Sequence, residues 1–233
     1  MTAAAAKAES WRRRLLLPNY QIGEAARYAD ISPRTVVDWH KDGGRKTLSS
    51  REKRAALSYM QLIEVAVVAA FRKAGVSLKH VKAARGYIAM HLKSEYPFAE
   101  YSFKTDGKEL FMDYEQIEGT KGKGKLLRPD RYGQLAWDTI IGQLNEFEYE
   151  RKGIVVRWRV AGLESPVVID PRIAFGSPNV KGTPTWVVKG RWDAGEKIEE
   201  IADDFGLKKP DVIEALKFER IDPTGRRKIP WMH

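Results

Sequence analysis

The residues most suited to a specific chemistry lie in a short run near the N-terminus, Ser32-Pro33-Arg34-Thr35. Serine followed by proline predicts a helix that begins here, because serine caps unpaired amides and proline at the first helical position costs no hydrogen bond. Arginine and threonine in the first turn of a helix can reach base edges in the major groove of DNA. The run therefore predicts a recognition helix.

This run begins the second of two short predicted helices, which span residues 23–28 and residues 33–41. A tight turn at Asp30-Ile31 is expected between them. The small side chains of Ala25 and Ala26 lie where the helices would cross, which allows the close packing of a helix-turn-helix. A helical hairpin buried in a core would have a similar sequence. The side chains expected to contact bases or phosphates are Ser32, Arg34, Thr35, Asp38, Lys41, Arg45 and Lys46.

The net charge of +10 is concentrated in the part of the chain that carries these helices. Residues 1–93 contain 18 Lys and Arg against 7 Asp and Glu, a net charge of +11, whereas residues 94–233 contain 23 against 24, a net charge of −1. Localised positive charge is typical of a surface that binds nucleic acid. The charge distribution therefore favours DNA binding over a buried hairpin.

The composition excludes several other classes of function. No cysteine is present, which rules out disulfides, thiol catalysis and thiolate metal sites. The four histidines show no metal-ligand spacing, so no metal, cofactor or catalytic site is predicted. The longest apolar run, Val65 to Phe71, is too short to cross a membrane, and the N-terminus does not resemble a signal peptide. A cytoplasmic protein without enzymatic activity is expected.

A glycine-rich stretch in the middle of the chain fits a phosphate-binding loop only in part. Gly119 to Lys125 matches the first seven positions of the motif, but Leu126 replaces the serine or threonine that contacts magnesium. Pro129 would also disrupt the helix that must follow. No nucleotide site is therefore predicted here.

The periodicity of the apolar residues predicts an α+β protein with a helical N-terminal part. Two longer helices are expected after the helix-turn-helix, at residues 59–74 and from Leu78 onward. The first of these is apolar on nearly every side, which is more than one buried stripe requires. We therefore expect another domain or a second subunit to cover it.

The rest of the chain is predicted to form a mixed α/β segment followed by a three-helix domain. The mixed segment is expected to contain one helix, at residues 132–144, and strands at residues 101–103, 110–112, 147–149 and 154–160. The C-terminal domain is expected to contain a strand at residues 167–169 and helices at residues 185–192, 197–205 and 210–218. The predicted parts are a basic arm (1–18), a DNA-binding domain (19–93), a middle domain (94–165), a helical domain (166–218) and a basic tail (219–233).

The N-terminal pattern resembles a known family of transcription regulators. Residues 20–44 and 57–84 look like the winged helix-turn-helix of MerR-type regulators, in the runs YQIGEAARYADISPRTVVDWHKDGG and LSYMQLIEVAVVAAFRKAGVSLKHVKAA. The resemblance covers residues 20–85 and implies that Asp42 to Arg54 form the wing. Val37 and Asp38 stand where the MerR pattern prefers a basic and an aromatic residue.

The C-terminal motifs resemble domain-of-unknown-function family 433, which is common in antitoxins of bacterial toxin-antitoxin systems. The matching pattern comprises Asp170-Pro171-Arg172, Phe175-Gly176-Ser177-Pro178, Gly182-Thr183, Gly195-Glu196, Glu200-Ile201-Ala202, Phe205-Gly206-Leu207 and Val212. With the MerR-like front and the mixed middle, nearly the whole chain is similar to VapB45-type antitoxins. The resemblance implies an antitoxin that neutralises a PIN-type ribonuclease toxin and represses its own operon. A homodimer is expected, because two recognition helices could then meet successive major grooves of operator DNA.

The resemblance also implies a role for the C-terminal tail. A PIN-type ribonuclease would hold Mg²⁺ or Mn²⁺ in a cluster of carboxylates, and a guanidinium can pair with two carboxylate oxygens in such a site. The residues expected to bind the toxin are Arg226, Arg227, Lys228, Ile229 and Trp231, with the tryptophan as the apolar anchor. An ordinary solvated terminus would have the same composition, so both interpretations stay open.

Two other classes of function also stay open. A MerR-like regulator without a toxin would sense a small ligand in the middle domain. An adjacent gene for a small ribonuclease would separate an antitoxin from this class. An enzyme is the third class, and no group of residues with catalytic spacing supports it.

Overall fold

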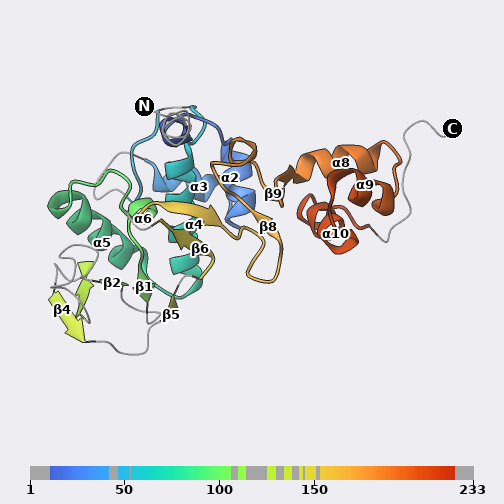
Figure 1. The fold of residues 1–233 in the computed structure, drawn as a ribbon. Coiled ribbons are helices and arrows are strands. Elements are labelled where there is room, and N and C mark those ends of the chain that lie inside the picture. The colour runs from blue at the N-terminus through green and yellow to red at the C-terminus, as the bar shows by residue number, and fades with distance from the viewer. Residues whose placement is uncertain are drawn as a thin grey trace, which may run out of the picture. The chain divides into compact units, whose positions relative to one another are not determined.

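Helices and short antiparallel strands make up the chain, which confirms the predicted α+β class (Figure 1). The computed structural model describes residues 11–41, 47–52, 54–105, 110–113, 125–129, 134–137, 142–143, 145–150 and 153–223. The chain divides into two units, residues 1–156 and residues 157–233. Each unit buries its own set of apolar side chains.

Five helices dominate the described part of the first unit, and local capping explains where several of them begin. They are α2 (Ile22–Tyr28), α3 (Pro33–Trp39), α4 (Tyr59–Lys73), α5 (Leu78–His91) and α6 (Pro97–Glu100). The Ser58 side chain accepts a hydrogen bond from the Gln61 amide, and the Ser77 side chain accepts one from the His80 amide. These caps satisfy amides that have no partner inside their own helix. The four helices predicted in this region are confirmed to within two residues.

Helix α4 is buried on nearly every side by the chain itself. Tyr59 to Ala69 are all buried, and helices α2, α5 and α6 contact α4. Phe98 and Phe103, from the predicted middle segment, pack edge-to-face on Phe71 with ring centroids 5.7 and 5.9 Å away. The cover that we expected from another domain or a second subunit therefore comes from this chain. Among the described residues, no helix is both long enough and apolar enough to span a membrane.

A five-stranded antiparallel sheet replaces the helix predicted at residues 132–144. Its strands are β1 (Lys104–Thr105), β2 (Leu110–Asp113), β3 (Lys125–Arg128), β4 (Gln134–Trp137) and β5 (Gly142–Gln143), in the order β4-β3-β2-β1-β5. The prediction is wrong because β4 pairs with β3 over four residues, from Lys125 opposite Trp137 to Arg128 opposite Gln134. Aromatic and β-branched residues in this segment suit a strand as well as a helix. Lys125 begins a strand, which agrees with the rejection of a phosphate-binding loop.

Strands β6 (Phe147–Tyr149) and β7 (Val155–Trp158) lie close to their predicted ranges and pair in a two-stranded sheet. The turn between them requires a glycine at Gly153. Its φ is +96°, and a Cβ atom there would lie 2.1 Å from the carbonyl oxygen of Glu100. The hydroxyl of Tyr59 donates a 3.2 Å hydrogen bond to the carbonyl of Val155, so this hairpin is joined to α4.

The second unit combines three helices with a small sheet. The helices are α8 (Thr185–Asp193), α9 (Ile198–Phe205) and α10 (Lys209–Phe218), all close to their predicted ranges. The strands β8 (Val167–Val168), β9 (Asn179–Val180) and β10 (Thr183–Pro184) pair in the order β10-β9-β8, with the short helix η3 (Ala174–Gly176) between β8 and β9. The core contains Val167, Val180, Val188, Ile201, Ala202, Leu207, Val212, Ala215 and Leu216.

The first residues of the predicted tail belong to this second core. The Ile221 amide donates a 2.9 Å hydrogen bond to the Leu216 carbonyl, and the Ile221 side chain packs against the core. The carboxylate of Glu219 accepts a 2.5 Å hydrogen bond from the hydroxyl of Thr185. Removing the chain from residue 219 onward would therefore damage the second unit itself.

Glu64 is a carboxyl group buried completely inside the helical core of the first unit. Its Oε2 accepts a 3.0 Å hydrogen bond from the Ser49 amide, and its Oε1 lies 3.9 Å from Nε of Arg85. Burial raises the pKa of Glu64 from 4.5 to about 7, and the Arg85 guanidinium opposes part of that rise. The carboxyl thus joins the segment after α3 to helices α4 and α5.

The raised pKa of Glu64 predicts that the contribution of this residue to stability falls as pH rises from 4.5 to 7. The folded state binds more protons than the unfolded state in this interval, so Glu64 contributes a loss of about 3 kcal/mol in the free energy of unfolding. Glu64→Gln should remove this contribution, because a side-chain amide does not titrate. Its oxygen can still accept the hydrogen bond from the Ser49 amide. Urea unfolding of the wild type and of Glu64→Gln from pH 4.5 to 8 measures this contribution. Glu52→Gln, at an exposed position, is the control. An unchanged pH slope in Glu64→Gln would contradict the assignment.

Candidate nucleic-acid interface

The turn between α2 and α3 is tight and closely packed, as a helix-turn-helix requires. Asp30 has a φ of +54°, a left-handed conformation that aspartate adopts more easily than most residues. The amide of Ile31 donates a 3.0 Å hydrogen bond to the carbonyl of Ala26. Ala25 and Ala26 are buried, and helices α2 and α3 contact each other. The alanines allow this approach because neither has a long side chain.

Helix α3 begins with the predicted cap. The Ser32 hydroxyl accepts a 3.0 Å hydrogen bond from the Thr35 amide, and the two hydroxyl oxygens of Ser32 and Thr35 lie 2.8 Å apart. Pro33 occupies the first turn, where its missing amide has no cost. Three of the residues expected to contact bases, Ser32, Arg34 and Thr35, therefore lie together at the start of this helix.

The inner face of α3 is held by buried side chains. Val36 and Trp39 are buried, and the amide of Leu48 donates to the carbonyl of Trp39 at 3.2 Å. His40 is also buried, with Nδ1 2.8 Å from the carbonyl oxygen of Val36. Burial lowers the pKa of His40, so the imidazole is neutral at pH 7. The buried side chains thus fix the orientation of α3, and its opposite face is exposed to solvent.

The outer face of α3 carries Arg34 and Asp38, and Lys41 follows just after the helix ends. Asp38 lies between two cations: its Oδ2 is 3.0 Å from Nε of Arg34, and its Oδ1 is 2.5 Å from Nζ of Lys41. The side chain of Arg34 is 75% exposed and that of Asp38 is 43% exposed. Lys41 first, and then Arg34, hold the pKa of Asp38 below its usual range. This face can offer donors to bases and phosphates.

Two of the expected phosphate contacts, Arg45 and Lys46, lie outside the described residues, so their role stays a prediction. The predicted wing is described only at residues 47–52 and 54, and that part contains no strand. Thr47, Leu48 and Ser49 are nevertheless buried, and the amides of Leu48 and Ser49 donate to Trp39 and Glu64 as described above. The segment after α3 is therefore bonded to the rest of the first unit at Leu48 and Ser49.

The described part of the predicted N-terminal arm packs on the first unit. Arg12 forms an ion pair of 2.6 Å with Glu150. Leu15 is buried, and its carbonyl accepts a 3.2 Å hydrogen bond from the Met60 amide. This position of Arg12 does not support a role in reaching DNA.

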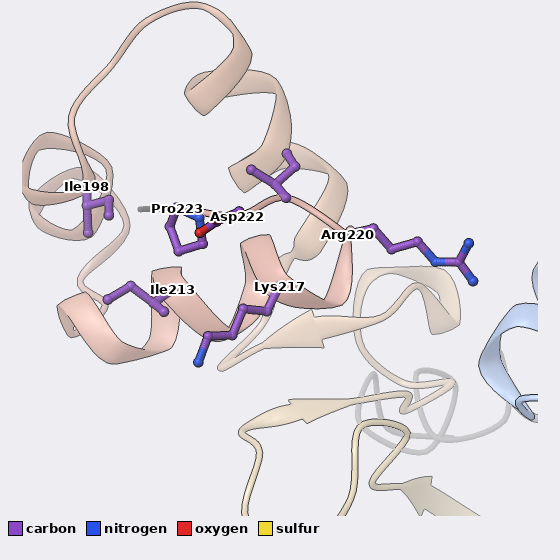
Figure 2. A pocket seen from close by; sticks show the side chains of 7 residues that line it. Ile198, Ile213, Lys217, Arg220, Asp222 and Pro223 are labelled. Atoms are coloured by element: carbon purple, nitrogen blue, oxygen red, sulfur yellow. The ribbon is translucent and has the colours of Figure 1, made fainter. Parts of the chain in front are cut away.

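A second candidate site is a hollow in the second unit that the sequence analysis did not predict (Figure 2). Its volume is about 530 Å³, and it is lined by Ile198, Ile213, Lys217, Arg220, Ile221, Asp222 and Pro223. The isoleucines and the proline ring give it an apolar floor, while the guanidinium of Arg220 extends away from it (Figure 2). The hollow can accept an apolar side chain. Half-buried isoleucines are a weak signal in sequence, which explains why the hollow was not predicted.

The residues expected to bind a toxin, Arg226, Arg227, Lys228, Ile229 and Trp231, lie outside the described residues. The first of them, Arg226, lies three residues after Pro223, which lines the hollow. Trp186 is 61% exposed, whereas Trp192 packs against the core of the second unit.

Comparison with known proteins shows similarity to a family model, a curated protein and a solved structure. Residues 167–218 match the family described as a protein of unknown function, DUF433. The chain is 24% identical over 224 residues to "Putative antitoxin VapB45" of Mycobacterium tuberculosis strain ATCC 25618 / H37Rv, covering 86% of this chain and 93% of that protein. The crystal structure of Rv2018 from Mycobacterium tuberculosis shares the fold, with a TM-score of 0.60 at 20% identity over 87% of this chain and 99% of that one. The predicted similarity to VapB45-type antitoxins is confirmed.

The cap at Ser32 predicts the local stability of the candidate recognition helix. Ser32→Ala should destabilise α3 by about 1 kcal/mol, because the Thr35 amide loses its acceptor. Ser32→Asp should keep most of that stability, since aspartate caps as well as serine. Native-state hydrogen exchange at Thr35 and Val36 measures the effect, and we expect about fivefold faster exchange in the alanine variant. Equal exchange in all three proteins would show that the cap is not important.

Proposed function

Because this chain is similar to a VapB45-type antitoxin over most of its length, we propose that it is the antitoxin of a type II toxin-antitoxin pair. The proposed partner is a PIN-type ribonuclease that the antitoxin binds and neutralises. The antitoxin also represses its own operon by binding operator DNA, in the manner of a MerR-like regulator. It acts as a homodimer and catalyses no reaction.

The exposed start of α3 is the observation that supports DNA binding most directly. Arg34 projects into solvent from the first turn of a helix whose opposite face is buried through Val36 and Trp39. A helix fits the major groove, and an arginine in its first turn can donate two hydrogen bonds to guanine. Of the two parts of the chain, residues 1–93 carry the net positive charge that attracts phosphate.

A dimer explains how such a short helix can select an operator. One recognition helix contacts only a few base pairs, which is too little for specificity in a genome. Two copies related by a two-fold axis would read half-sites about 34 Å apart, one turn of DNA. The operator is therefore expected to be palindromic.

The second unit is the proposed toxin-binding part. The apolar hollow at Ile198 and Ile213 lies where the chain continues into the basic tail, so one partner could contact both features. Arg226, Arg227 and Lys228 would pair with the carboxylates of the ribonuclease site, and Ile229 and Trp231 would add apolar contacts. Guanidinium groups in that site would compete with the metal ion that the ribonuclease needs.

Substitution of Arg34 tests the DNA-binding proposal. Arg34→Ala should weaken binding to the operator by about 1 to 3 kcal/mol and relax preference at one base pair. Lys46→Ala should instead weaken binding to all sequences alike and reduce the salt dependence by about one unit of slope. Fluorescence anisotropy with operator and unrelated duplexes at several salt concentrations measures both effects. Equal operator affinity in wild type and Arg34→Ala would contradict this placement of the recognition helix.

Removal of the tail after Pro223 tests the toxin-binding proposal. The truncation keeps Glu219 and Ile221, which the second unit needs for its own core. We expect the shortened protein to lose neutralisation of the co-expressed ribonuclease while keeping operator binding. Alanine at Arg226, Arg227 and Lys228 in the full chain separates the effect of charge from that of Ile229 and Trp231.

If the truncated protein still neutralised the ribonuclease fully, the tail would not be needed for toxin binding. A full-length protein that binds operator DNA but forms no complex with the product of the adjacent gene would favour the other class, a ligand-sensing regulator without a toxin. Co-purification of the two gene products distinguishes these cases.

A further inference from the structure

The acidic residue on the outer face of α3 is unexpected for a helix that binds a polyanion. Arg34 and Asp38 are four residues apart on α3, and Lys41 lies three residues after Asp38, just beyond the end of the helix, so the two cations flank the carboxylate. Both carboxylate oxygens of Asp38 are used, one by each cation. A negative charge at this position opposes the approach of phosphates, so its presence needs a compensating role.

Stability does not supply that role. The ion pairs of Asp38 are exposed, and exposed pairs of this kind add little to the stability of a folded protein. The buried contacts of Val36 and Trp39 hold α3 in place without them. The carboxylate is charged at neutral pH, as an exposed aspartate normally is, and Lys41 and Arg34 favour the charged form further by lowering its pKa. It therefore acts as a fixed negative charge beside the exposed Arg34 guanidinium.

The geometry of the contact restricts the Arg34 guanidinium. Its Nε donates to Asp38 at 3.0 Å, which leaves the two terminal nitrogens as outward donors at the far end of the side chain. The guanidinium is planar, so fixing Nε also orients that pair of donors. Guanine presents two acceptors, O6 and N7, side by side in the major groove, and two parallel donors match them.

We propose that Asp38 is a positioning residue for base recognition: it orients Arg34 toward a guanine and disfavours DNA sites that lack that guanine. The inference rests on the proposed binding of DNA by α3. Its chemical consequence is that Asp38 lowers affinity for DNA in general while raising selectivity at one base pair. Arg34 makes the base contact, and Asp38 acts through it.

Selection from a pool of randomised duplexes, with the full-length protein, tests this role. Wild type should enrich a guanine at one position of each half-site. Asp38→Asn should reduce that preference about tenfold, within the range expected of a bidentate pair. The same variant should bind unrelated DNA more tightly, with a steeper salt dependence, because a negative charge is lost. Asp38→Glu should restore part of the preference, since a glutamate can still reach Arg34.

Asp30→Asn is the matched control for net charge. Asp30 is exposed in the turn before α3, and asparagine tolerates its left-handed backbone. This variant should also tighten binding to unrelated DNA, but it should leave the guanine preference unchanged. An effect on base preference that is equal in Asp30→Asn and Asp38→Asn would overturn the positioning role.

The remaining outcomes are equally decisive. An unchanged guanine preference in Asp38→Asn would sink the inference while leaving DNA binding intact. Loss of a preferred cytosine, with the guanine retained, would mean that Asp38 accepts from a base directly and does not act through Arg34. A wild-type protein that binds no duplex at all would instead overturn the proposed function.

Discussion

The first unit depends on the requirement to bury a helix that is apolar around almost its whole circumference. No single neighbour can cover α4, so α2, α5 and α6 contact it and the ring of Phe103 packs on its Phe71. Removal of this apolar surface from water is the favourable term that holds these elements together. Helix α3 packs on α2, and the segment that follows α3 is bonded to Glu64 of α4. The helix proposed to bind DNA is therefore held in place by elements that pack around α4.

Two carboxylates show how position decides electrostatic behaviour in this unit. Glu64 is buried, and the loss of water raises its pKa to about 7 despite the nearby Arg85. Asp38 is exposed, and Lys41 and Arg34 lower its pKa. The first acts on folding, because it holds Ser49 and α4 together inside the core. The second is proposed to act on recognition, because its charge faces the partner.

The proposed division of work matches the two units. The candidate DNA-binding helix and the excess of positive charge belong to the first, and the apolar hollow next to the tail belongs to the second. Separate cores allow each unit to keep its own binding surface when the other is occupied. An antitoxin that must hold a toxin and an operator at once would benefit from this arrangement.

Local chemistry in the sequence determined the start of α3, because the Ser32 cap and the proline beside it act within one turn. The helices of the second unit were predictable for the same reason, since their periodicity and end signals are local. Partners distant in sequence could not be foreseen. The strand at Gln134–Trp137 exists through pairing with β3, and the burial of Glu64 depends on Ser49, Arg85 and the surrounding helices. The hollow likewise forms only where α9, α10 and Pro223 meet. Tertiary structure decided these features because each depends on distant residues brought together, which no short stretch of sequence encodes.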